Sequence, residues 1–181
     1  MKNSAHDITT YVFAPDEGLL IDANVWLVLY GPQGNPPKPK TQIYSSALKS
    51  ILAAKSRIYL DILVMSEFVN ACARFEYDRQ PVASKPASFK AFRDSAAFQP
   101  IAKGIAAACR KLEKHCERLE SQFSTVDISA ILAEYENCKA DFNDLVLAEL
   151  CKSKGLSLVT HDGDFRDRGL TLISANPKLL T

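Results

Sequence analysis

The sequence has 181 residues, a length typical of one domain that can bury a hydrophobic core. Its formal net charge is +1 at pH 7, so any surface that binds nucleic acid must be local and balanced by acidic residues elsewhere. No apolar run approaches the roughly 20 residues that span a bilayer, and the N-terminus lacks a secretory pattern. The five cysteines form no Cys-x-x-Cys pair, which favours reduced thiols. We expect one cytoplasmic domain over residues 1–181 with no membrane partner.

The first strong pattern follows a polar N-terminal segment, residues 1–17, which we expect to be loosely held. Residues 18–21 contain a short, wholly apolar run, typical of a parallel strand covered on both faces. Asp22 stands where that strand ends, either as a simple cap or as a functional carboxylate. Asn24 can cap a helix over residues 25–30.

The next segment alternates between loop, helix and strand. Residues 31–40 hold four prolines and two glycines and therefore predict a loop. A second strand is predicted over residues 57–60, and Asp61 after it suits the cap of a buried helix over residues 62–77. Residues 41–54 fit an amphipathic helix, whose predicted apolar face is Ile43, Ala47, Leu48, Ile51 and Leu52.

Glu67 lies in the middle of the predicted buried helix, with Leu63, Val64 and Phe68 at helical spacing around it. A carboxylate is costly to bury without a partner. A solvated stripe on the helix surface is the alternative. The apolar neighbours favour a functional or paired carboxylate.

Residues 78–126 differ in character from the rest and predict a helical insertion. A proline-containing connection leads to a long helix that begins near Pro100 and ends near residue 122. Its polar face is either a solvated surface with intrahelical ion pairs or a surface that contacts RNA phosphates. The candidate substrate-binding residues on that face are Arg110, Lys111, Lys114 and Arg118.

The C-terminal part combines acidic residues with a helix and a strand. Asp127 can cap a helix over residues 128–138, and Asp141, Asn143 or Asp144 can cap a helix that ends at Gly155. A buried strand is predicted over residues 156–160, with Asp162 and Asp164 behind it, and a last strand over residues 170–173.

Apolar strands separated by helices predict an α/β fold with a mostly parallel sheet. In such sheets the functional residues collect beyond the carboxyl ends of the strands. After caps are assigned, a surplus of acids on four separate elements remains: Asp22, Glu67, Asp144 and Asp162. Converging acids repel one another unless a cation holds them, and oxygen-only ligands select Mg²⁺ or Mn²⁺.

Four motifs together resemble the PIN domain family, which includes the VapC-type toxins of toxin–antitoxin pairs. They are IDAN after a strand, SEF inside a helix, NDLVLAELCKSKGLSLVT, and HDGDF. The resemblance implies a five-stranded parallel sheet flanked by helices, with its core at about 18–77 and 127–174. It also implies a Mg²⁺- or Mn²⁺-dependent endoribonuclease that acts on RNA, with an antitoxin or a second copy of the chain as partners.

The resemblance also implies which side chains act. The catalytic acids fall on Asp22, Glu67, Asp144 and Asp162, and the metal ligands on Asp22, Asp144 and Asp162. Asn24, Thr160, Asp141 and Asp164 are supporting residues, and the last acid can be registered on Asp162 or Asp164.

Two other functions remain open from the sequence. A phosphatase of the haloacid-dehalogenase type also places Asp after a strand, but it needs a second Asp where this chain has Asn24. A PIN-like module that binds RNA or protein without catalysis is the other alternative, although it would not need all four acids.

Overall fold

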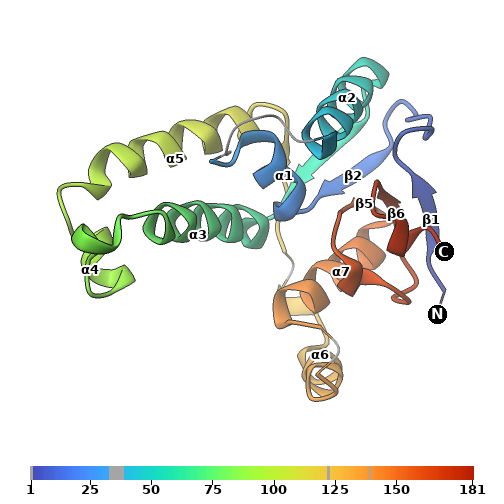
Figure 1. The fold of residues 1–181 in the computed structure, drawn as a ribbon. Helices are drawn as coiled ribbons and strands as arrows, with labels where there is room; N and C mark the ends of the chain where they lie inside the picture. Colours follow the sequence, from blue (N-terminus) through green and yellow to red (C-terminus); the bar gives the residue numbers. More distant parts are fainter. Residues whose placement is uncertain (1, 33–38, 122, 139) are drawn as a thin grey trace.

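The computed structural model describes residues 2–32, 39–121, 123–138 and 140–181. Over these residues the centre of the fold is a six-stranded, fully parallel sheet with the order β1-β6-β5-β2-β3-β4 (Figure 1). The strands are β1 (Ser4–Asp7), β2 (Gly18–Ile21), β3 (Arg57–Leu60), β4 (Glu117–Arg118), β5 (Ser157–Val159) and β6 (Thr171–Ser174).

The helices form two groups. In one group α1 contacts α2, α3 and α5, and in the other α6 packs on α7. Helices α3 and α5 run side by side away from the sheet, and α4 lies at their far end (Figure 1). The helices are α1 (Ala23–Tyr30), α2 (Pro39–Ala54), α3 (Ile62–Asp78), α4 (Phe89–Arg93), α5 (Phe98–Glu113), α6 (Ile128–Tyr135) and α7 (Phe142–Lys154).

The middle of the sheet forms the centre of the hydrophobic core. Strand β2 lies between β3 and β5, and Leu19, Leu20 and Leu158 on these central strands are fully buried. A strand that is covered on both faces needs apolar side chains at successive positions, because both directions of the pleat face protein. The predicted α/β fold class is confirmed.

Capping residues define where the helices that carry the acids begin and end. The Asp61 side chain accepts a 2.8 Å hydrogen bond from the Leu63 backbone N–H, which confirms it as the cap of α3. Asp141 likewise accepts from the Asp144 backbone N–H at 2.9 Å and caps α7. Gly155 ends α7 with a left-handed φ of 63°, a conformation that glycine adopts without strain.

Two further strands correct the expected pattern. Residues 4–7 were expected to be loosely held, but they form β1 at the edge of the sheet beside β6. The predicted long helix ends at Glu113, and the chain then turns so that the Leu119 N–H donates to the Leu60 carbonyl at 2.9 Å. This turn adds β4 beside β3, so the sheet has six strands among the described residues where five were expected. Two-residue strands carry almost no periodic signal.

Several element boundaries also differ from the predictions. Helix α1 begins at Ala23, with Asp22 and not Asn24 at the cap position. Helix α2 begins at Pro39, because proline suits a first helical turn, while residues 33–38 of the predicted loop lie outside the described part. Its buried face includes Tyr44, whereas the predicted core residue Leu52 is 41% exposed. Helix α6 ends at Tyr135, earlier than predicted.

Within the described residues, no helix combines the length and the apolar character that crossing a membrane requires.

Candidate active site at the carboxyl edge of the sheet

The candidate site forms where β2 and β5 end side by side. The Asp22 backbone N–H donates to the Val159 carbonyl at 3.0 Å, which continues the pairing of the two strands by one step. Asp22 therefore lies beside Thr160, although the two residues are far apart in sequence. This edge is where parallel α/β sheets present their functional groups.

A network of hydrogen bonds fixes the Asp22 carboxylate, which is only 3% exposed. The Thr160 hydroxyl donates to Asp22 Oδ2 at 2.7 Å, and the Asn24 amide donates to the same oxygen at 2.5 Å. Thr160 Oγ1 in turn accepts from the Asn24 amide at 3.1 Å and from the Asp162 backbone N–H at 3.0 Å. The His161 backbone N–H donates to Asn24 Oδ1 at 3.1 Å. Asn24 and Thr160 therefore tie Asp22 to the loop that carries Asp162.

Burial dominates the electrostatics of Asp22. It raises the pKa of Asp22 to about 6, and the charge of Asp162 adds to the increase. The hydrogen bonds from Thr160 and from the backbone at Asn24 act in the opposite direction, because they stabilise the charged form. Burial prevails over these bonds, so Asp22 is partly protonated near neutral pH unless a cation is close.

Glu67 and Asp144 face the same carboxylates from two helices. The pKa of Glu67 rises to about 7, first through burial and then through the charges of Asp22, Asp141 and Asp162. The pKa of Asp144 rises to about 8, again first through burial and then through Asp141, Asp22, Asp162 and Glu67. The structure therefore gathers all four sequence-predicted acids into one group, from β2, α3, α7 and the loop after β5. We call Asp22, Glu67, Asp144 and Asp162 the acid group.

The chemistry of this donor set fits a hard divalent cation. The oxygens are carboxylate oxygens, and beyond the effect of burial the neighbouring negative charges raise the pKa values of Glu67 and Asp144, which a cation would oppose. In the positions that the side chains take here, however, no three His, Cys, Asp or Glu residues of the described chain surround a point as ligands of one ion. The donor type, and not a closed ligand shell, indicates the metal.

Of the two positions proposed for the last acid, the geometry favours Asp162. It is half-buried, it raises the pKa values of the other acids, and its Oδ1 accepts from the Asp164 backbone N–H at 3.0 Å. Asp164 is exposed in the short turn that follows. Asp141 caps α7 and also raises the pKa values of Glu67 and Asp144, so it lies beside the acid group.

The predicted basic residues lie on α5 or just after it, apart from this network. Arg118 is exposed and pairs with Glu113, and Arg110 lines an apolar cavity of about 370 Å³ between α3 and α5. The charges that shift the pKa values of Glu67 and Asp144 are all carboxylates. Lys40, which the sequence did not single out, lies near enough to His161 to lower its pKa, after burial as the main cause.

Sequence reasoning missed the residues that hold the loop of Asp162. The Thr160 carbonyl accepts from Ser174 Oγ at 2.6 Å, and the Asn176 amide donates to the His161 carbonyl at 2.7 Å. Tyr44 reaches the same loop from α2. Serine, asparagine and tyrosine carry no motif in these positions, so their contacts emerge only from the fold.

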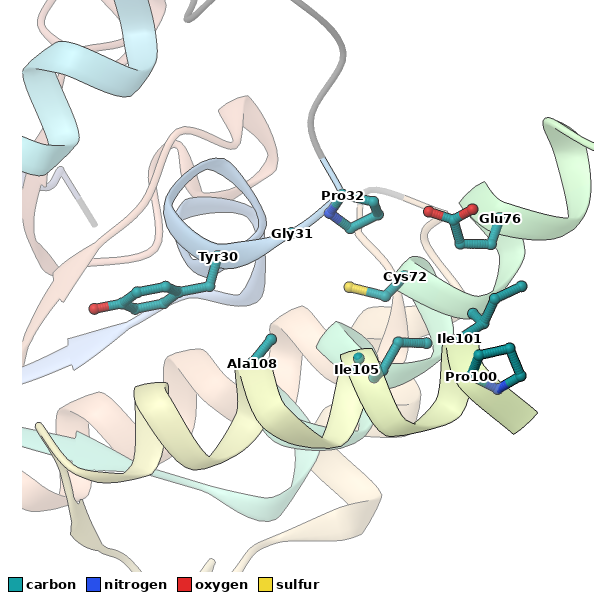
Figure 2. Close-up of a pocket in the computed structure, with 10 residues that line it drawn as sticks. Tyr30, Gly31, Pro32, Cys72, Glu76, Pro100, Ile101, Ile105 and Ala108 are labelled. Atoms are coloured by element: carbon teal, nitrogen blue, oxygen red, sulfur yellow. The ribbon is translucent and has the colours of Figure 1, made fainter. Parts of the chain in front are cut away.

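A larger cavity lies elsewhere. It measures about 420 Å³ and opens between α1, α3 and α5, lined mainly by apolar side chains and by the edge of Tyr30 (Figure 2). Cys72 and Glu76 lie in its wall, and the pKa of Cys72 is raised to about 11 by burial. A protonated thiol is a weak nucleophile. No member of the acid group lines this cavity, so it is not the candidate active site.

The fold and the acid group together define an α/β domain with a carboxylate site at the edge of a parallel sheet. The sequence matches the PIN domain over residues 19–169. The chain therefore belongs to the PIN domain family, whose members are generally nucleases.

Solved structures show the same fold at low sequence identity. A chain of VapBC2 from Rickettsia felis, in a crystal structure bound to a DNA fragment from their promoter, aligns with a TM-score of 0.51 and 13% identity. The alignment covers 87% of this chain and 98% of that one. PAE2754 from Pyrobaculum aerophilum aligns with a TM-score of 0.50 and 19% identity, over 93% of this chain and 96% of its own. No curated protein sequence matches the chain.

Proposed function

We propose that the chain is a Mg²⁺- or Mn²⁺-dependent endoribonuclease that hydrolyses phosphodiester bonds in RNA. The observation that carries the proposal is the acid group itself. Burial, and then the charges of the neighbouring carboxylates, raise the pKa of Glu67 to about 7 and that of Asp144 to about 8. A protein that only needed to fold would gain from apolar side chains in these places, because partly buried, mutually repelling carboxylates reduce stability.

Asp22, Asp144 and Asp162 would hold the cation. When bound, it would polarise the phosphodiester and lower the pKa of a water molecule. Asp22 is suited to a fixed ligand, because Thr160 and Asn24 restrain its carboxylate. Glu67 has a pKa near neutrality and can accept a proton from the attacking water and release it again. Cationic side chains must supply the contact with the RNA backbone, since carboxylates repel phosphate.

The haloacid-dehalogenase alternative fits the site poorly. That chemistry needs a second carboxylate two positions after the first. The Asn24 amide instead donates a hydrogen bond to Asp22, so it serves as a support and cannot take a proton as an acid would.

The proposal is tested with purified protein and a fluorescent single-stranded RNA, in Mn²⁺, in Mg²⁺ and in EDTA. We expect cleavage with either metal, loss of cleavage in EDTA, and a loss of at least about 100-fold in Asp22→Asn. Exposed Asp164→Asn serves as the matched acid-to-amide control. Cleavage that persists in EDTA or in Asp22→Asn would contradict the metal mechanism. RNA binding without cleavage in any metal would favour the non-catalytic module.

We further propose that the chain acts as the toxin of a pair and that a cognate antitoxin protein binds it. The fold similarity to a chain of VapBC2 supports this assignment. Induced expression should stop growth, Asp22→Asn should relieve the arrest, and co-expression of the cognate antitoxin should do the same. Normal growth while the active enzyme accumulates would argue against toxin function.

A further inference from the structure

Tyr44 is a polar side chain in an otherwise apolar place. It lies on α2, it is 1% exposed, and its ring packs in the hydrophobic core. Burial raises the pKa of its hydroxyl, so it remains neutral. A phenylalanine would fill the same space without the need to satisfy a buried hydroxyl group.

The Tyr44 hydroxyl reaches three partners on the loops that follow β5 and β6. It lies 2.9 Å from His161 Nδ1 and donates to the Thr160 carbonyl at 3.2 Å. The Ala175 backbone N–H donates to it at 3.2 Å. If the hydroxyl proton points to the Thr160 carbonyl, the contact with His161 needs a proton on Nδ1; if it points to Nδ1, that nitrogen is unprotonated. In either case the contact favours one tautomer of the His161 ring.

These contacts complete the support of residues 160–162. Asn24 holds the His161 N–H, Asn176 holds the His161 carbonyl, and Thr160 Oγ1 holds the Asp162 N–H. Tyr44 contributes the contact that connects α2 to this loop. This loop carries Asp162 and is bonded to Asp22 through Thr160. A shift of the loop would therefore move one carboxylate relative to the other.

We propose that Tyr44 is a positioning residue of the candidate active site. Its hydroxyl fixes the Thr160 carbonyl and the His161 ring, and thereby sets the distance between Asp22 and Asp162. The inference rests on the proposed metal-dependent function for its activity readout. The placement of the loop itself does not depend on that function and can be measured separately.

The test compares Tyr44→Phe with Tyr77→Phe. Tyr77, near the end of α3, also donates to a backbone carbonyl, that of Pro86 at 3.1 Å. Each variant should show a small and similar decrease in melting temperature, because each loses one hydrogen bond. In Tyr44→Phe alone, kcat at saturating RNA and the affinity for Mn²⁺ in calorimetry should each fall about 10- to 100-fold, with KM for RNA unchanged. A Tyr44→Phe enzyme that matches Tyr77→Phe in both quantities would overturn the proposal.

A spectroscopic measurement tests the positioning role of Tyr44 independently of the proposed nuclease function. The chain has three histidines, so the ring nitrogens of His161 can be assigned by NMR with His161→Gln. We expect a single tautomer in the native protein and averaged ring-nitrogen shifts in Tyr44→Phe. If the native protein cleaves no RNA but the ring shifts and the Mn²⁺ affinity change as expected, the nuclease function fails and the positioning stands. Unchanged ring shifts in Tyr44→Phe would refute the positioning, whatever the activity.

Discussion

Glu67 shows how a single residue of the proposed site can oppose folding. Its pKa is raised to about 7 from an ordinary value of 4.5. The folded state therefore binds the Glu67 proton more tightly than the unfolded state does. Stability from this group is fully present below the unfolded pKa near 4.5 and is lost as the pH rises to about 7.

Glu67→Gln should remove this pH dependence in metal-free protein. The variant and the native protein should have similar melting temperatures at pH 4.5, and the variant should become the more stable one as the pH rises to 7 and above. Calorimetric melting over that pH range measures the difference. Activity in Mn²⁺ should fall about 100-fold or more, since an amide cannot accept a proton. A gap in melting temperature that does not change with pH would contradict the raised pKa.

Among single residues, the sequence indicated the acids and two of their supports, Asn24 and Thr160, and missed the others. Asp22, Glu67, Asp144 and Asp162 could be identified because carboxylates next to apolar runs need a reason. Tyr44 could not, because tyrosine is common in helices and its hydroxyl finds its partners only when β5 and β6 end beside α2. Contacts between residues more than 100 positions apart leave no local pattern.

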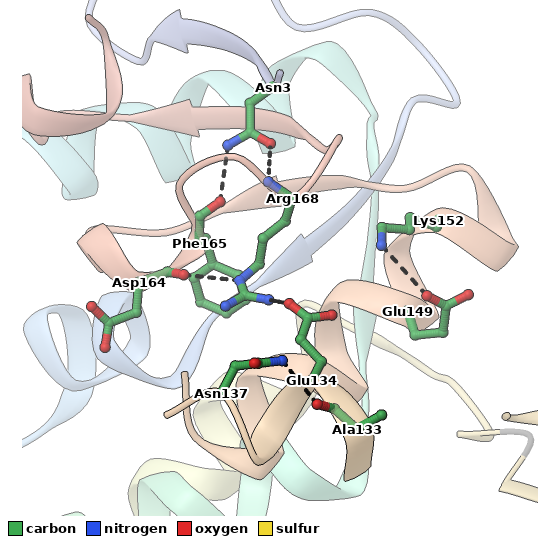
Figure 3. Close-up of polar contacts among 9 residues, drawn as sticks. All are labelled: Asn3, Ala133, Glu134, Asn137, Glu149, Lys152, Asp164, Phe165 and Arg168. Carbon is green, nitrogen blue, oxygen red and sulfur yellow. Dashed lines mark hydrogen bonds and ion pairs between the residues drawn. The ribbon is translucent and has the colours of Figure 1, made fainter. Parts of the chain in front are cut away.

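At the scale of elements, Arg168 holds the loop between β5 and β6 against α6 (Figure 3). Its side chain is 8% exposed, it pairs with Glu134 on α6, and its Nε donates to the Asp164 carbonyl at 2.9 Å. Asn3 accepts from the Arg168 backbone N–H at 3.0 Å and donates to the Phe165 carbonyl at 2.9 Å. The loop that follows Asp162 is thus anchored by α6 and by the N-terminal segment.

Arg168→Met should therefore reduce the unfolding free energy more than a substitution of its partner Glu134 does. We expect a loss of about 2 kcal/mol of unfolding free energy, because a buried charged hydrogen-bond donor disappears. Glu134→Gln should cost about 0.5 kcal/mol, because that carboxylate is half exposed and solvent screens the pair. Urea unfolding of both variants measures the difference. Equal losses would mean that the ion pair, and not the bond to Asp164, holds the loop.

The basic residues of α5 give a second test at this scale. If Lys111 and Lys114 contact RNA, Lys111→Ala with Lys114→Ala should weaken binding and reduce the slope of log affinity against log salt by about 0.7 per lost contact. Mn²⁺ binding should be unaffected. Lys152→Ala with Lys154→Ala is the matched control, because these lysines lie at the end of α7, toward the amino edge of the sheet. Identical salt slopes in the two double variants would assign α5 to scaffold alone.

At the scale of the whole molecule, we expect the proposed cation at the acid group to make stability depend on metal. A ligand that binds only the folded state at about 100 times its dissociation constant adds about 2.7 kcal/mol. For a domain of this size we expect the melting temperature to rise by about 5–10 °C in Mn²⁺. Asp144→Asn should lose most of this rise, and Asp164→Asn should keep it. A native protein with the same melting temperature in Mn²⁺ and in EDTA would contradict metal binding at this site.

The fold class followed from the sequence because helices of clear periodicity separate the apolar strands β2, β3 and β5, and the apolar strand β6 follows. The two edge strands of the sheet, β1 and β4, did not follow from the sequence. β1 is polar and half-buried, and β4 consists of two exposed residues inside a helical pattern. At an edge, pairing with the neighbouring strand decides the structure, and local composition has little influence.

The pairing of β2 with β5 also determines when the acid group can form. Leu19 is aligned with Ser157, so the centre of the sheet joins segments from opposite ends of the chain. Such non-local pairing makes folding slow, because a long loop must close before the contacts form. During synthesis, Asp22 is translated before Thr160, Asp162 and the neighbouring strand β5. The acid group can therefore assemble only after residues 157–162 have been synthesised and β5 has paired with β2.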